Sequence, residues 1–217
     1  MSYIAARREE EKERRRGEIL DAAESLYAKH GWEGLTVDQV ARTARLSRAL
    51  VYVYFKDKED LLFGIGERAL ILLRDRFAAA VRTCAGDGLA QTEVIFRAYT
   101  SYALEFSHYF DFIARFHQRP TEPGANPNEA ACHRTGDEVL GFVVQAIEAG
   151  VRDGSIHSGY AEKPLMTALS LWAFAHGATQ ITIAKAGELA RLGVSVPELG
   201  NYIVELLRTL LTNAPRR

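Results

Sequence analysis

The spacing of apolar residues, with very few breaks, is the sequence feature that most limits how this chain can fold. Only six of its 217 residues are proline, and apolar side chains recur three and four positions apart over most of its length. This period places apolar side chains on one face of a helix, whereas the alternation typical of a half-buried strand is rare. We therefore expect an all-α fold.

Turn-forming and capping residues divide this pattern into separate helices. Gly31 suits the left-handed backbone that ends a helix, so the first helix is expected to end at about residue 30. Thr36, Ser47 and Asp57 are expected N-caps, because a side-chain oxygen there accepts an otherwise unpaired backbone N–H. The helices that follow are expected over residues 37–43, 48–55, 58–85, 89–106, 108–119, 127–153, 161–186 and 197–213. The charged segment 7–16 is expected to be helical only in part and to fray.

The short expected helices 37–43 and 48–55 form a candidate helix-turn-helix. Burial of the apolar positions would leave Arg48, Ala49, Tyr52 and Tyr54 on the outer face of the second helix, which could enter the major groove of DNA. The whole chain has a net charge of only -1, but residues 42–58 carry five basic side chains and one acidic side chain. Local positive charge favours contact with phosphates. From the spacing alone, a tight helical corner without a DNA-binding role is an equal alternative.

The segment Leu35–Leu62, LTVDQVARTARLSRALVYVYFKDKEDLL, resembles the DNA-binding domain of the TetR family of regulators. The preceding segment Ile19–Thr36 is similar to the family's first helix and the link after it, so the resemblance covers about the first 65 residues. It implies a dimeric, ligand-responsive transcriptional regulator, most commonly a repressor. The expected domains are residues 1–56, a three-helix DNA-binding domain with an N-terminal arm, and residues 57–217, a larger helical domain for ligand binding and dimerisation.

The resemblance also implies roles for individual residues. Thr36 and Lys58 would hold phosphates, Arg48 and Ala49 would face bases, and the two tyrosines would contact the backbone or base edges. Two positions depart from the family: Arg45 stands where glycine is usual, and Leu50 where a small hydroxyl residue is usual. The predicted DNA-binding residues are Thr36, Arg45, Ser47, Arg48, Ala49, Tyr52, Tyr54 and Lys58. Asp38 would repel phosphates if it faced them, so it is expected to point aside.

Aromatic residues at helical spacing characterise the second expected domain. A small-molecule site needs apolar walls with a few placed polar groups, although core packing is the simpler explanation for any single aromatic residue. The predicted effector pocket is lined by Tyr102, Phe106, Phe112, Phe116, Phe142, Trp172 and His176. Polar residues such as Gln145 and Thr179 are interspersed among them. No carboxylate is expected to face inward, so the expected effector is a neutral or anionic aromatic or acyl compound.

The last two long helices are expected to form a two-fold dimer surface. The final helix carries an apolar face that includes Leu206 and Leu210 and is too wide for one neighbouring helix; closure of the domain core is the alternative. The helix 58–85 is expected to link DNA and ligand binding. Gly64 and Gly66 inside it could let the helix flex or could permit close packing, and the sequence leaves both open.

Other classes of function have little support in the sequence. The two cysteines, Cys84 and Cys132, and the scattered histidines lack the spacing of a metal site, so no metal or cofactor is expected. Sequence motifs for a nucleophile elbow, a phosphate loop or a dinucleotide-binding fold are absent, so an enzyme is not expected. A purely protein-binding role remains an alternative, which the basic strip disfavours. The N-terminus has no apolar signal core and no run of residues is long enough for a bilayer, so a cytoplasmic protein is expected.

Overall fold

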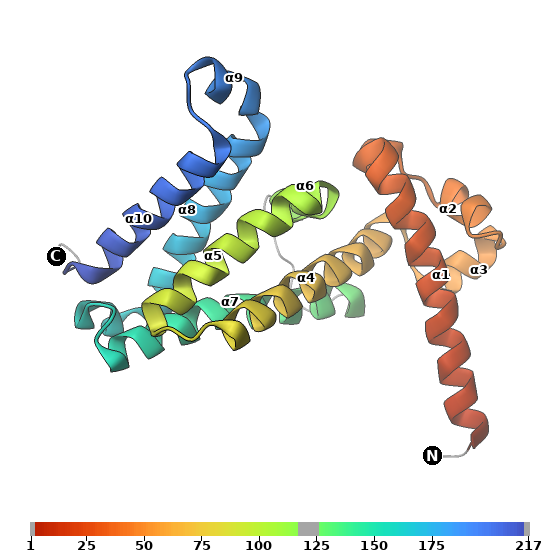
Figure 1. Ribbon diagram of the computed structural model, residues 1–217. Coiled ribbons are helices and arrows are strands. Elements are labelled where there is room, and N and C mark those ends of the chain that lie inside the picture. The colour runs from red at the N-terminus through yellow and green to blue at the C-terminus, as the bar shows by residue number, and fades with distance from the viewer. Residues whose placement is uncertain (1–2, 117–125, 215–217) are drawn as a thin grey trace. The chain divides into compact units, whose positions relative to one another are not determined.

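The computed structural model describes residues 3–116 and 126–214, without the side chains of residues 115 and 116. All regular elements in this part of the chain are helices, which confirms the expected all-α class (Figure 1). In chain order they are α1 (Tyr3–Gly34), α2 (Val37–Thr43), α3 (Arg48–Tyr54), α4 (Lys58–Thr83), α5 (Gly88–Glu105), α6 (Ser107–Phe116), α7 (Pro127–Asp153), η1 (Ser158–Glu162), α8 (Pro164–Ala184), α9 (Ala186–Arg191) and α10 (Val196–Thr212).

Most of these boundaries follow from the capping residues. The side-chain oxygens of Thr36, Ser47 and Asp57 accept the backbone N–H groups of Gln39, Leu50 and Asp60, as expected for N-caps. The expected helix over 161–186 is instead a short 3-10 turn followed by α8, which starts at Pro164. Proline is favoured at the first position of a helix because its missing N–H would have no partner there.

Gly31 ends the regular part of α1. Its φ of 64° and ψ of -171° interrupt the helical backbone, and the helical assignment resumes for a few residues up to Gly34. The left-handed φ is accessible to glycine without the steric cost that a Cβ would bring. The predicted end of the first helix at about residue 30 is therefore confirmed.

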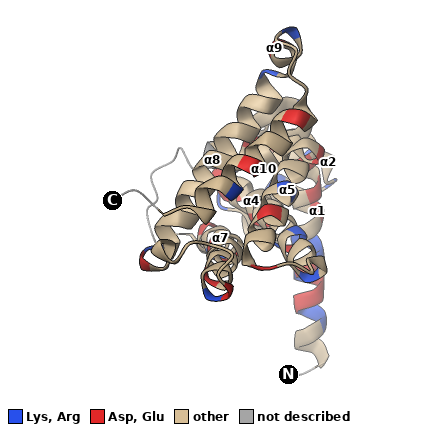
Figure 2. Ribbon diagram, turned by 60° about the vertical axis from the view of Figure 1, so that its left-hand side comes forward, with Lys and Arg blue, Asp and Glu red and all other residues tan. Residues whose placement is uncertain are grey.

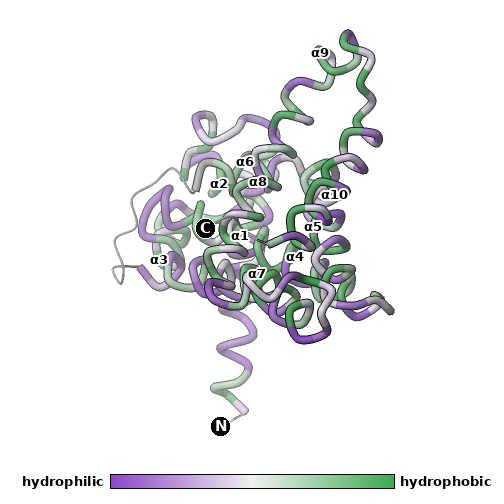
Figure 3. The backbone as a smooth tube through the Cα atoms, turned by 90° about the vertical axis from the view of Figure 1, so that its left-hand side faces the viewer, coloured by the Kyte–Doolittle hydropathy of each residue, from purple (hydrophilic) through white to green (hydrophobic). Residues whose placement is uncertain are grey.

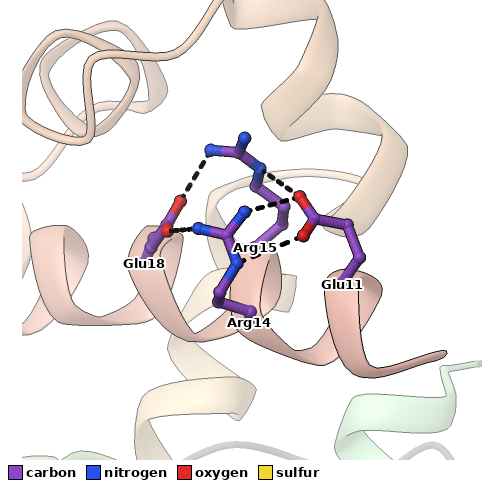
Figure 4. Close-up of polar contacts among 4 residues, drawn as sticks. All are labelled: Glu11, Arg14, Arg15 and Glu18. Carbon is purple, nitrogen blue, oxygen red and sulfur yellow. Dashed lines mark hydrogen bonds and ion pairs between the residues drawn. The ribbon is translucent and has the colours of Figure 1, made fainter. Parts of the chain in front are cut away.

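The charged N-terminal part of α1 is helical, and the expectation that residues 7–16 fray was wrong. Its exposed turns carry both acidic and basic residues (Figure 2) and are hydrophilic (Figure 3). Arg14 and Arg15 each pair with both Glu11 and Glu18, three or four positions away (Figure 4). Opposite charges three or four positions apart stabilise a helix, and these pairs favour the helix over the frayed chain.

The chain forms two compact units. The first comprises Met1–Ala69 and His108–Arg134, and the second comprises Leu70–Ser107 and Thr135–Arg217. Helices α4 and α7 contribute residues to both units. The division after residue 56 that the sequence predicts remains a prediction.

The first unit is built around α1, α2 and α3, which lie together in Figure 1. Its core contains fully buried apolar side chains from each of these helices and from the residues that join them. They include Ile19, Leu20, Ala23, Leu35, Val40, Val51 and Phe55. The spacing of these residues leaves one face of α3 free of core contacts.

The second unit is built around α5, which contacts both α8 and α10 (Figure 1). Buried residues on the facing sides include Ile95, Ala168 and Leu207. Among the described residues, the structure has no helix with the length and apolar character needed to cross a membrane.

Candidate functional site

Helices α2 and α3 are joined by the turn Ala44–Leu46, and backbone hydrogen bonds fix its shape. The N–H of Ala44 donates to the carbonyl of Val40 at 2.8 Å, and the N–H of Leu46 donates to that of Ala41 at 2.9 Å. These bonds use carbonyls that the end of α2 would otherwise leave without a partner. The start of α3 is thereby held at a defined place relative to α2.

Arg45 occupies the left-handed region in this turn, with φ of 57°, and among the described residues it is the sole non-glycine residue with a positive φ. A side chain with a Cβ pays roughly 1–2 kcal/mol for this conformation. The departure from glycine is therefore a real strain in the fold. Compared with glycine, arginine adds an exposed positive charge at this turn.

The exposed face of α3 consists mainly of the residues predicted to meet DNA. Arg48, Ala49 and Tyr52 are exposed, while Val51 is fully buried in the core of the first unit. Tyr54, at the end of the helix, is half-buried. This pattern gives α3 one buried and one solvent-facing side, as a recognition helix requires.

Arg48, the first residue of α3, is held by two side chains. Its Nε lies 3.1 Å from Oδ1 of Asp38 in the first turn of α2, and its Nη1 donates to Oδ2 at 3.5 Å. Its Nη2 donates to the hydroxyl of Tyr52 at 3.3 Å, and the guanidinium lies 5.5 Å from the centre of that ring. The carboxylate of Asp38 is directed at Arg48, and the expectation that it points aside from phosphates stays a prediction.

Two other predicted phosphate contacts also have partners within the first unit. The ammonium of Lys58 lies 3.9 Å from the centre of the Trp32 ring, a cation–π contact. The hydroxyl of Thr36 donates to Oε1 of Gln39 at 2.7 Å while it caps α2. Both contacts keep these groups near the start of a helix, where the backbone N–H groups favour an anion.

A buried polar network fixes the start of α4, and sequence reasoning missed it. Asp60, only 5% exposed, accepts a hydrogen bond from the backbone of Lys56 at 2.8 Å and one from the side chain of Asn128 at 2.6 Å. Asn128 in turn accepts from Arg16 at 2.9 Å, and Arg16 pairs with Glu67 at 3.2 Å. The contact ties the first turn of α7 to α1 and α4. No spacing rule could have found it, because its members are far apart in the sequence.

In the second unit, aromatic side chains from four helices form a connected cluster. The ring of Phe77 lies 6.5 Å from that of Tyr99 and 6.4 Å from that of Phe142, and the ring of His176 lies 6.3 Å from that of Tyr99 and 6.0 Å from that of Trp172. Phe142, Trp172 and His176 belong to the predicted pocket, whereas Phe77 and Tyr99 were not assigned to it. The sequence pattern that could have identified them is helical spacing: Tyr99 lies three positions before Tyr102, and Phe77 lies four positions after Leu73.

Polar groups lie within this aromatic cluster. The hydroxyl of Tyr99 and Nδ1 of His176 are 2.7 Å apart, and burial lowers the pKa of His176 from its ordinary value of 6.5. Burial also raises the pKa of Tyr99, an effect that a hydrogen bond with Trp172 opposes. Both residues are therefore neutral at pH 7. One turn further along α8, the hydroxyl of Thr179 is buried and has no hydrogen-bond partner among the described residues.

The other predicted pocket residues are divided between the two units. Tyr102 is fully buried next to Phe106, 5.7 Å away between ring centres, and both belong to the second unit. Phe112 belongs to the first unit, where its ring is packed against Gly66 of α4. The side chain of Phe116 lies outside the described residues. Within the described part of the chain, no three acidic, histidine or cysteine side chains come together as metal ligands.

Helices α8 and α10 also carry exposed apolar side chains. They include Leu165, Met166, Leu169, Phe174, Ile181, Tyr202, Leu206 and Leu210. Clusters of exposed apolar residues of this kind commonly mark interaction surfaces.

Comparison with known proteins gives results that agree with this arrangement. Residues 19–65 match the family model described as bacterial regulatory proteins, tetR family. The chain is 45% identical over 51 residues to the transcriptional regulator HbdR of Aromatoleum sp. (24% of this chain and 22% of HbdR). It is 36% identical over 77 residues to the transcriptional repressor AcnR of Corynebacterium diphtheriae (36% of this chain and 37% of AcnR). The matches thus span well under half the length of these two relatives.

Solved structures extend the similarity to nearly the whole fold. A protein of unknown function from Rhodococcus sp. RHA1 has a TM-score of 0.75 and 25% identity, covering 92% of this chain and 96% of that one. The regulator FadR of Bacillus subtilis, solved in complex with stearoyl-CoA, has a TM-score of 0.67 and 14% identity, covering 92% of this chain and 98% of that one. Residues 19–65 therefore carry the DNA-binding domain of the tetR family of bacterial regulatory proteins, and nearly the whole chain shares its helical fold with these solved structures.

Proposed function

We propose that the protein is a ligand-responsive transcriptional repressor that binds a palindromic DNA operator as a homodimer and is released by a small apolar or aromatic effector. The exposed face of α3, which begins with Arg48, is the observation that carries this proposal. The strip of basic residues around it favours a polyanion. A function on the chromosome would place the protein in the cytoplasm.

The proposed DNA contacts divide into two kinds. Arg48 and Ala49 would face base edges, since the N-terminal residues of a recognition helix lie deepest in the groove. Thr36, Arg45, Ser47 and Lys58 would contact phosphates, which set affinity and register but carry no sequence information. Tyr52 and Tyr54 would contact the backbone or base edges.

The aromatic cluster of the second unit supports an effector site there. Phe77, Phe142 and Trp172 offer apolar surface, and neutral Tyr99 and His176 offer hydrogen bonds without charge. A few placed polar groups among apolar walls are typical of small-molecule sites. FadR of Bacillus subtilis was crystallised with stearoyl-CoA, and that example makes an acyl compound one candidate class. Phe112 belongs to the first unit, and the side chain of Phe116 lies outside the described residues, so both remain sequence predictions for this site.

The exposed apolar residues of α8 and α10 support the proposed homodimer. A two-fold axis would use the same surface on both chains and would present two α3 helices to one side of the duplex. In helix-turn-helix dimers the half-sites are about one helical turn of DNA apart, which predicts an operator with inverted symmetry. Effector binding would act by favouring a state in which the two α3 helices no longer match that spacing.

The two kinds of DNA contact provide a direct test. A pool of random duplexes, selected on the purified protein, gives the preferred sequence. Arg48→Ala should reduce the preference at one or two positions, since a bidentate contact with guanine is worth about 1–3 kcal/mol of discrimination. Lys58→Ala should weaken binding to all duplexes about equally and lower the salt slope by about one.

Arg191→Ala is the matched control for a lost surface cation, because Arg191 belongs to α9 in the second unit. It should change neither the preferred sequence nor the salt slope. If the native protein selects no sequence, or if Arg48→Ala keeps the full native preference, the assignment of α3 as the recognition helix is wrong.

A further inference from the structure

We infer that Asp38 is a positioning residue that holds Arg48 in the orientation needed to recognise a guanine. This inference rests on the proposed DNA-binding function and assigns a role to an acidic residue in an otherwise basic surface. It concerns base specificity rather than overall affinity for DNA.

The geometry around Arg48 comes from two separate helices. Asp38, in the first turn of α2, engages Nε at 3.1 Å and Nη1 at 3.5 Å, and Tyr52, one turn further along α3, engages Nη2 at 3.3 Å. All three guanidinium nitrogens thus have a contact, although the side chain is exposed. A long arginine side chain on the surface would otherwise sample many rotamers, and ordering it only on DNA would cost side-chain conformational entropy.

The remaining donors match what a guanine edge accepts. A guanidinium has five N–H groups; one on Nη1 donates to Asp38 and one on Nη2 donates to Tyr52, while Nε lies 3.1 Å from Asp38 in an ion pair. One N–H therefore remains on each terminal nitrogen. Bidentate recognition of guanine uses two parallel N–H groups, one for O6 and one for N7. The contacts that hold Arg48 leave one N–H donor on each terminal nitrogen for such a contact.

The charge balance at this place favours the same role. A lone carboxylate on a DNA-facing surface would repel phosphates and weaken binding to every sequence. Here the charge of Asp38 is neutralised by Arg48, so the pair together adds little to general attraction. The pair fixes the orientation of the Arg48 guanidinium. This orientation affects which base is preferred and has little influence on the salt dependence of binding.

Asp38 has a second candidate role, which the test must separate from the first. An acidic residue in the first turn of a helix stabilises that helix by interacting with its positive N-terminal end. A purely structural role of this kind would affect the stability of α2 and the binding of all duplexes together. A positioning role would affect only the base that Arg48 recognises.

The test compares the full-length protein with its variants Asp38→Asn, Glu33→Gln and Arg48→Ala on the selected duplex and on its single-base variants. Asp38→Asn should reduce discrimination at the position read by Arg48 by about fivefold or more, because an unheld guanidinium can adapt to other bases. Its affinity for random duplex should stay equal or rise. Adding Asp38→Asn to Arg48→Ala should cause no further loss of discrimination.

Glu33→Gln is the matched control, since it removes one exposed negative charge of the first unit and has no contact with Arg48 among the described interactions. It should alter all sequences equally. Asp38→Ser, which suits the first turn of a helix, must reproduce the profile of Asp38→Asn if that variant proves unstable in a thermal melt. A uniform change for all sequences with native discrimination would overturn the inference, whereas loss of sequence selection by the native protein would overturn the proposed function itself.

Discussion

Replacement of Gly66 by alanine tests whether the glycines of α4 serve flexibility or close packing. A Cβ built at this position would lie 2.0 Å from Cζ and 2.3 Å from Cε1 of Phe112. Phe112 is only 1% exposed, so its ring has little room to move away. Gly64 is similarly crowded, since its Cβ would lie 2.7 Å from Cδ2 of Leu20. The structure therefore favours close packing at both positions.

The size of the effect follows from two opposing contributions. Alanine in place of glycine inside a helix gains about 1 kcal/mol of stability. Overpacking of a filled core costs typically about 1–3 kcal/mol. Gly141 in α7 supplies the reference, because a Cβ there would meet no atom of the described residues within 4 Å beyond its own helix backbone. We expect Gly141→Ala to raise the free energy of unfolding by about 1 kcal/mol and Gly66→Ala to lie about 1–3 kcal/mol below it.

The assay is thermal unfolding followed by circular dichroism, with all variants at the same protomer concentration because a dimer melts in a concentration-dependent way. For a chain of this size each kcal/mol corresponds to about 2–4 °C in Tm. Phe112→Leu removes the ring that causes the overlap, so the cost of Gly66→Ala should shrink in the double mutant. If Gly66→Ala is as stable as Gly141→Ala, the close approach of α4 and Phe112 has been misjudged.

Three further outcomes follow from the second unit. Leu206→Asp with Leu210→Asp should give a monomer in sedimentation experiments, because burying unpaired charge at the proposed interface costs several kcal/mol; a folded dimer with native operator affinity would place the interface elsewhere. Thr179→Val should raise the free energy of unfolding, measured in urea, by about 1 kcal/mol, since it removes a buried hydroxyl that has no partner within the described part of the chain. Thr182→Val removes a hydroxyl bonded at 2.8 Å and should give no such gain; equal effects would show that the Thr179 hydroxyl is satisfied. Burial lowers the pKa of His176 from 6.5, so below about that pH the unfolded chain binds the proton more readily and the free energy of unfolding falls as the pH falls. His176→Gln should flatten this part of the plot of unfolding free energy against pH. An unchanged plot would mean that His176 titrates normally when folded.

The helices of this protein could be predicted from local signals because those signals act within a few residues. Thr36 and Ser47 cap the next helix through their own side chains, and Gly31 adopts the left-handed φ that ends α1. The same locality explains why residues 48, 49 and 52 could be assigned to one exposed face of α3. These interactions depend on spacing along the chain, which the sequence displays directly.

Contacts between distant segments could not be predicted in this way. Periodicity showed that Phe112 lies on an apolar face but not which core that face joins, and the structure places it against Gly66 in the first unit. Asp38 was expected to point aside because only its charge was considered. Asp38 and Arg48 lie on separate helices, α2 and α3, joined by a turn in which Arg45 has a left-handed φ. Helical spacing within α2 or α3 therefore could not reveal their contact.

Arg45 itself offers a final prediction, since its backbone and its side chain have opposite effects. Arg45→Gly should relieve the left-handed strain and raise the free energy of unfolding by about 1 kcal/mol. It should also remove an exposed cation from the proposed DNA surface, lowering the affinity for random duplex and reducing the salt slope by about one. Because Arg48 is neutralised by Asp38, Arg48→Ala should reduce the salt slope less than Arg45→Gly does. If Arg45→Gly is more stable but binds random duplex with native affinity and salt slope, the arginine makes no phosphate contact. The strain in the turn would then not be offset by any gain in DNA binding.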